Sequence, residues 1–147
     1  RVNRLVQSCV MEIDGGGSVV QRDFHDGVIN CRARLTYTEV NQVLTDRDPA
    51  VVQRLAPLVP MLELMAELFE ILNARRQRLG SIDFDLEEPD ITLDDEGMVA
   101  AITAAERNVA HRIIEEFMLL ANETVATFLE ATGRPRWPGA PRWCRCA

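Results

Sequence analysis

The chain has 147 residues, a net charge of −7, 47 % apolar residues and four cysteines. This length suits one domain with a hydrophobic core, and the mixed composition excludes a disordered polymer. An acidic surface argues against general nucleic-acid binding, although a local channel can be basic on an acidic body. With no apolar run near the ~18 residues of a membrane span and no secretory pattern, we expect a cytoplasmic protein with reduced thiols and no membrane partner.

The first third of the chain predicts a hairpin followed by a short helix. Two segments rich in β-branched residues, 5–14 and 18–29, flank three consecutive glycines, and glycine adopts positive φ without steric cost. Thr36 is followed three residues later by Glu39, the spacing of a capping box in which each side chain satisfies a free backbone N–H. We therefore expect a β-hairpin and then a helix over about residues 37–44.

The middle of the chain predicts two more helices. Asp48 followed by Pro49 is a helix start, because aspartate caps free N–H groups and proline is favoured in the first turn. Apolar residues at helical spacing then predict a long helix from about Pro60 to Leu79, which Gly80 ends. The stripe expected to be buried consists of Met61, Leu64, Met65, Leu68 and Leu72.

A second hairpin and a second long helix complete the predicted elements. Residues 91–94 and 98–103 flank Asp95-Glu96-Gly97, a turn sequence. Residues 107–131 carry a continuous apolar face and precede Gly133. Strands in hairpins with separate helices define an α+β fold, here antiparallel hairpins with long packing helices.

The last 15 positions differ in character from the rest. Residues 133–147 are rich in Pro, Arg, Trp and Cys, without periodicity and without acids. Such a composition does not bury a core, so we interpret residues 1–132 as the domain and residues 133–147 as an atypical tail, out of frame or disordered. The alternative is a basic tail that binds RNA through Arg and Trp side chains.

Few residues indicate chemistry by their spacing alone. The sequence contains no nucleophilic triad, phosphate loop or zinc pattern. The acids between residues 83 and 90 suit a magnesium site or, as we favour, a solvated strand edge. His111 and Glu115 lie four residues apart on one helix face, which favours a helical pair over a metal site.

Three segments together carry a family resemblance. Residues 9–40 end in RLTYTEV, residues 66–89 contain IDFDLEEP, and residues 106–126 read ERNVAHRIIEEFMLLANETVA. In this order they resemble the RNB catalytic domain of the ribonuclease R and ribonuclease II family, closer to the ribonuclease R branch, and the likeness covers nearly all of residues 3–132.

The resemblance implies a 3′-to-5′ exoribonuclease that hydrolyses RNA to nucleoside monophosphates with Mg²⁺. The family's magnesium-binding aspartates lie upstream of the matched segments and its catalytic arginine downstream, so the resemblance places no catalytic residue and no metal ligand in this chain. We accordingly expect part of an RNB domain, inactive alone. Its expected partners are RNA and the missing remainder of its own enzyme.

Three RNA contacts follow from the resemblance by matching position. Tyr37 of RLTYTEV matches a tyrosine of the RNA channel, Phe84 of IDFDL matches an aromatic residue that stacks on the terminal base, and Glu115 matches an acid that contacts ribose. Stacking tolerates any base, and a carboxylate that accepts a hydrogen bond from the 2′-OH distinguishes RNA from DNA. The competing hypothesis is a non-catalytic α+β protein-interaction module that binds a partner through its long amphipathic helix.

Overall fold

The computed structural model describes residues 2–81, 89–93, 96–104 and 107–132. In chain order the elements are β1 (Asn3–Ile13), β2 (Val19–Asn30), α1 (Tyr37–Asn41), the π-helical turn η1 (Gln42–Asp46), α2 (Pro49–Arg54), α3 (Val59–Arg78), β3 (Pro89–Leu93), β4 (Val99–Ala104) and α4 (Val109–Ala131). The described strands form two antiparallel pairs, β1 with β2 and β3 with β4. The predicted α+β fold with hairpins and long helices is confirmed.

The turn of the first hairpin depends on Asp14 and glycine. Oδ1 of Asp14 accepts hydrogen bonds from the backbone N–H of Gly16 at 2.9 Å and of Ser18 at 2.8 Å. Gly17 has φ of 84° and lies against α3, where an added Cβ would meet the Ile71 carbonyl oxygen at 3.3 Å. Both the backbone conformation and the close approach therefore require glycine at this position.

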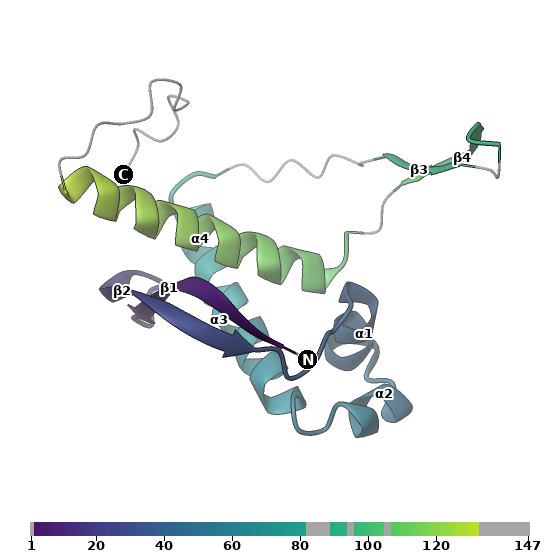
Figure 1. Cartoon of the computed structure of the whole chain (residues 1–147), viewed down its shortest axis with the longest axis horizontal. Helices are drawn as coiled ribbons and strands as arrows, with labels where there is room; N and C mark the ends of the chain where they lie inside the picture. The colour runs from purple at the N-terminus through teal and green to yellow at the C-terminus, as the bar shows by residue number, and fades with distance from the viewer. Residues whose placement is uncertain (1, 82–88, 94–95, 105–106, 133–147) are drawn as a thin grey trace.

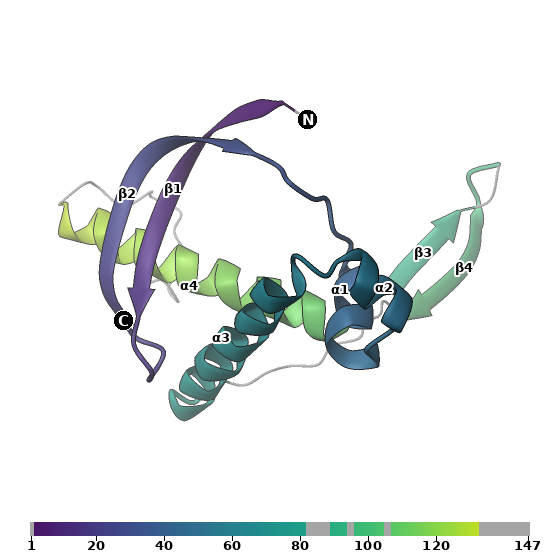
Figure 2. The ribbon, with the colours of Figure 1, turned by 90° about the horizontal axis from the view of Figure 1, so that it is seen from below.

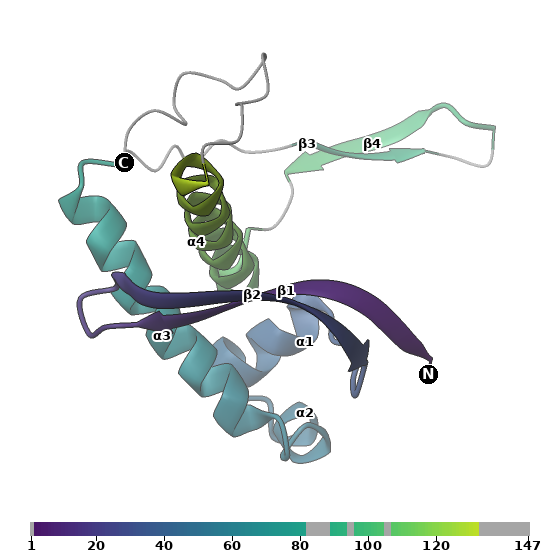
Figure 3. The ribbon, with the colours of Figure 1, turned by 60° about the vertical axis from the view of Figure 1, so that its left-hand side comes forward.

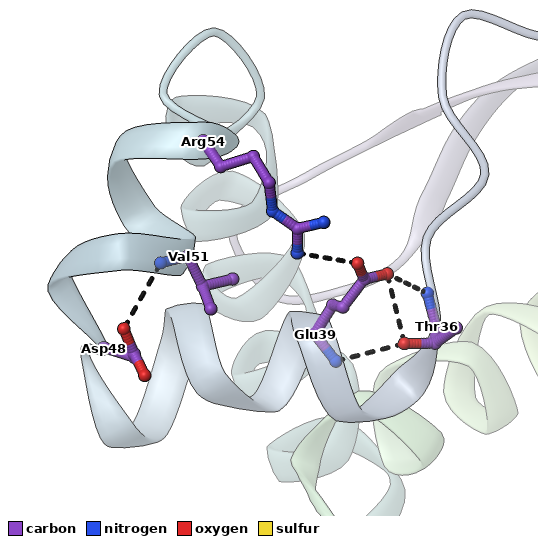
Figure 4. Close-up of polar contacts among 5 residues, drawn as sticks. All are labelled: Thr36, Glu39, Asp48, Val51 and Arg54. Carbon is purple, nitrogen blue, oxygen red and sulfur yellow. Dashed lines mark hydrogen bonds and ion pairs between the residues drawn. The ribbon is translucent and has the colours of Figure 1, made fainter.

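The start of α1 is fixed by the predicted capping box. The backbone N–H of Glu39 donates to Oγ1 of Thr36 at 3.2 Å, and the backbone N–H of Thr36 donates to Oε2 of Glu39 at 2.9 Å. Arg54 of α2 binds the other carboxylate oxygen at 2.7 Å (Figure 4). The helix then continues as η1 to Asp46, two residues beyond the predicted end at residue 44, and Arg47 follows as the C-cap in the left-handed conformation.

The core lies between α3, α4 and η1. Its buried apolar residues are Val43, Leu62, Phe69, Leu72, Ala110, Ile113 and Leu120. The predicted stripe on α3 is wrong for Met61 and Leu64, which are 50 % and 64 % exposed. The buried positions Leu62, Phe69 and Leu72 follow one another at helical spacing, so the face turned to α4 is offset from the predicted one.

Helix α4 is the element around which the others are arranged. It packs against α3 and α1, and the β1–β2 hairpin crosses it (Figures 1 and 2). The rings of Phe24 in β2 and Phe128 in α4 lie 4.3 Å apart between their centroids. The β3–β4 hairpin projects away from the helices (Figure 3). Among the described residues, no helix combines the length and apolar character needed to cross a membrane.

Candidate functional site

A hollow beside α1 and α4 brings together two of the three residues identified from the sequence. Its volume is about 500 Å³. Its lining residues are Tyr37, His111, Ile114, Glu115, Met118, Leu119 and Asn122. Phe84, the third residue, lies outside the described residues. The hollow thus presents an aromatic ring, an imidazole, a carboxylate and an amide along an otherwise apolar wall.

The capping box fixes the position of Tyr37 at the start of α1. It is the first residue of α1, directly after Thr36, so the start of the helix sets where its side chain emerges. Hydrogen bonds from the Thr36 backbone N–H and then from Arg54 hold the pKa of Glu39 below its usual value, which keeps the capping carboxylate ionised. Tyr37 itself is 45 % exposed. A half-exposed ring on an ordered helix end is available to a ligand.

His111 forms the other half of an aromatic pair. The rings of Tyr37 and His111 lie 3.9 Å apart between centroids, with their planes tilted by 30°. Nδ1 of His111 lies 2.9 Å from Oδ1 of Asn108. That oxygen also accepts hydrogen bonds from the backbone N–H groups of Ala110 and His111, so Asn108 both caps α4 and holds the imidazole.

Glu115 lies on the same wall and pairs with an arginine. Its Oε2 lies 2.7 Å from Nη2 of Arg107, and 43 % of its side-chain surface is exposed. The predicted helical pair with His111 is therefore wrong, because Arg107 binds Glu115 and Asn108 binds His111. A carboxylate can accept several hydrogen bonds, so the contact with Arg107 leaves Glu115 able to accept another from a ligand.

The neighbouring acid, Glu116, has the opposite environment. Its side chain is 6 % exposed, and its Oε1 lies 2.7 Å from Nη2 of Arg76 in α3, which is 24 % exposed. The sequence interpretation missed this ion pair. The available signal was the phase of the helix, since Glu116 lies three residues after Ile113 and four before Leu120, both in the core. An acid on a buried face needs a cation.

An apolar hollow of about 600 Å³ adjoins the first on the other side of Tyr37. It runs between α1, α3 and the start of α4, and Tyr37 and Ile114 line both hollows. Leu62 and Met65 of α3 form part of its wall. Tyr37 therefore stands at the boundary between a hollow that carries several polar side chains and an apolar one.

The described side chains do not fit a metal site. Within residues 2–81 and the later described segments, no three His, Cys, Asp or Glu side chains gather closely enough to hold an ion. The side chains of the acidic run between residues 83 and 90 lie outside the described part of the chain.

Comparison with known proteins identifies the class. Residues 1–137 match the RNB domain, so the chain belongs to the RNB domain family. Similar relatives are ribonuclease R 1 of Lactococcus lactis, 44 % identical over 92 % of this chain, and ribonuclease R of Aquifex aeolicus, 43 % identical over 90 % of it. The chain spans 16 % and 19 % of the lengths of these two proteins.

A solved structure agrees with the sequence relatives. The fold matches RNase R of Mycoplasma genitalium, solved in complex with ribose-methylated single-stranded RNA, with a TM-score of 0.76 and 26 % identity. The match covers 90 % of this chain and 20 % of that one. The resemblance to the ribonuclease R and ribonuclease II family is therefore confirmed.

Proposed function

We propose that this chain forms one wall of the RNA channel in a 3′-to-5′ exoribonuclease of the ribonuclease R type, which hydrolyses RNA to nucleoside monophosphates. The observation that carries the proposal is that the Tyr37 ring and the Glu115 carboxylate line one hollow. The relatives named ribonuclease R support it, as do the Mycoplasma genitalium RNase R complexes with single-stranded and with double-stranded RNA.

In this proposal the hollow receives a nucleotide. The exposed face of Tyr37 stacks on a base, a contact that accepts any base because each has a π-face. Glu115 accepts a hydrogen bond from the ribose 2′-OH, which a deoxyribose does not have. Phe84 contributes a second stacking surface. Recognition through stacking and the sugar, without reading base edges, suits an enzyme that digests RNA of any sequence.

Hydrolysis itself is assigned to residues outside this chain. We propose that the parent enzyme uses Mg²⁺ and that the ligands come from another part of that enzyme, as the family resemblance implies. The pure 147-residue chain is then expected to show no Mg²⁺-dependent RNA hydrolysis. Mg²⁺-dependent hydrolysis that the chain shows and Glu115→Ala abolishes would contradict the assignment, because a contaminating nuclease would act equally in both preparations.

The remainder of the same enzyme is the second partner we propose. Helix α4 exposes Met118 and Leu119 at the hollow, and further along the helix it exposes Val125, Phe128 and Leu129. Exposed apolar surface of this kind marks a contact region, and the relatives are about five times longer than the chain. We place the parent enzyme in the cytoplasm, on the sequence grounds given above.

The test is binding of a fluorescently labelled RNA oligonucleotide to the chain. Replacing Tyr37 by Ala should weaken binding by about tenfold, since stacking on an aromatic side chain contributes about 1–3 kcal/mol per base. Leu64→Ala is the matched control, because Leu64 is also a large exposed apolar residue but lies on α3 outside the hollow. Absence of RNA binding by the folded wild-type chain would instead favour the protein-interaction module.

A further inference from the structure

The contacts of Tyr37 raise the question of what holds its ring. The residue is 45 % exposed, so the capping box fixes its backbone and leaves the ring bordered by solvent on one side. Binding a ligand with a mobile side chain costs free energy, because the side chain must be ordered. A neighbour that holds the ring beforehand therefore raises affinity without touching the ligand.

His111 is that neighbour by geometry. Its ring lies 3.9 Å from the Tyr37 ring between centroids, tilted by 30°, so the two rings are in direct contact. Both residues line the hollow that contains Glu115. His111 lies in the first turn of α4 and Tyr37 in the first turn of α1, so the pair also joins the ends of two helices.

The imidazole is itself held in one orientation. The Asn108 side-chain oxygen faces the helix end, because two backbone N–H groups donate to it. The third group near this oxygen, Nδ1 of His111 at 2.9 Å, must then be a donor. In the neutral ring Nε2 carries no proton, so Asn108 fixes both the tautomer and the ring plane.

We propose that His111 is a positioning residue for RNA binding, which holds the Tyr37 ring in the orientation that receives a base while Asn108 holds the imidazole. The proposal rests on the proposed function, because it concerns the ligand assigned to the same hollow. The role of His111 is exerted through Tyr37, so removing His111 matters only while Tyr37 is present.

A double-mutant cycle on RNA affinity tests this dependence. The chain is compared with His111→Ala, Tyr37→Ala and the double variant, using a labelled RNA oligonucleotide. His111→Ala should weaken binding about 3- to 10-fold, the range of an aromatic pair, and should have no further effect in the Tyr37→Ala chain. His111→Phe keeps a stacking ring and should restore affinity to within about twofold. His25→Ala, on exposed β2, is the control histidine.

A spectroscopic readout follows the ring directly. Tyr37 is the single tyrosine of the chain, so fluorotyrosine gives one ¹⁹F NMR signal. We expect this signal to move toward that of free fluorotyrosine in His111→Ala and to stay shifted in His25→Ala. An unchanged signal in His111→Ala would mean that the imidazole does not hold the ring, and would overturn the proposal.

The possible outcomes distinguish a failure of the positioning role of His111 from a failure of the proposed function. If Tyr37→Ala weakens RNA binding and His111→Ala does not, the positioning role falls and the proposed function stands. If His111→Ala weakens binding equally with and without Tyr37, His111 acts on its own or on the fold, and the positioning role again falls. If Tyr37→Ala leaves RNA affinity unchanged, the proposed function loses this contact and the positioning role falls with it.

Discussion

Two adjacent acids on α4 occupy different environments. Glu115 lies on the wall of the hollow, 43 % exposed, and pairs with Arg107 near the start of the same helix. Glu116 is 6 % exposed and pairs with Arg76 on α3. Consecutive helix residues point about 100° apart, so one residue faces the hollow while the next faces the core.

Residue type alone does not assign a role on this helix. A buried carboxylate is costly unless it is paired, so Glu116 is best explained as part of the α3–α4 contact. An exposed pair contributes little to stability, so the pair of Glu115 with Arg107 is not needed to hold the helices together. The comparison therefore predicts that substitutions at the two positions separate stability from RNA recognition.

The largest effect is expected at Glu116. Glu116→Ala leaves Arg76 in a mostly buried position without its carboxylate, and should lower the free energy of unfolding by about 3 kcal/mol, as measured by urea denaturation. Replacing both partners, in the Arg76→Met and Glu116→Leu double variant, removes the unpaired charge. The double variant should be clearly more stable than the single one; equal destabilisation would show that the ion pair is not the cause.

A smaller effect is expected at Asn108, the N-cap residue of α4. Asn108→Ala removes the N-cap of the helix and should lower the free energy of unfolding by about 1 kcal/mol. Asn108→Ser keeps a capping oxygen and should recover most of that loss. Thermal unfolding of the two variants beside the wild-type chain measures the difference, and equal melting temperatures for all three would contradict the capping role.

Glu39 should show a dependence on pH. Its pKa is lowered chiefly by the Thr36 backbone N–H and then by Arg54, so its contribution to stability is present at neutral pH and is lost as pH falls through the lowered pKa. Glu39→Gln should therefore be less stable than wild type at neutral pH, with a difference that shrinks in acid. Urea denaturation at a series of pH values measures it, and a constant difference would contradict the ionic capping box.

The smallest stability effect is expected at Glu115 itself. Because its ion pair with Arg107 is substantially exposed, Glu115→Ala should change the free energy of unfolding by less than about 1 kcal/mol. Urea denaturation of Glu115→Ala beside Glu116→Ala gives the comparison within one helix. A loss at Glu115 as large as that at Glu116 would contradict the division of roles.

Local signals in the sequence predicted much of the fold. The capping box of Thr36 and Glu39 and the glycine turn before β2 depend on residues a few positions apart, and both occur as expected. The long helix expected from about Pro60 to Leu79 runs over Val59–Arg78. The exposed positions Met61 and Leu64 were misjudged because several helix faces of α3 carry apolar residues, and only the docking of α4 selects one.

The contacts that form the candidate site could not be predicted from residues that are close together in the sequence. The pair of Tyr37 with His111 and the pair of Arg76 with Glu116 join segments far apart in the chain, and their proximity results from how α4 packs on α1 and α3. Tyr37 and Glu115 were selected through the family resemblance, and the structure brings both to one hollow. Their contacts with RNA stay a prediction.

The most direct measurement is the ratio of RNA to DNA affinity of the chain, using two oligonucleotides of the same sequence. If Glu115 binds the ribose 2′-OH, Glu115→Ala should lower RNA affinity by about tenfold, since a hydrogen bond to a charged group contributes about 1.5–3 kcal/mol. DNA affinity should stay unchanged, because deoxyribose has no 2′-OH. Glu123→Ala removes an equal charge from the same helix outside the hollow and should keep the ratio. A ratio unchanged by Glu115→Ala would contradict the assignment of Glu115 to the ribose.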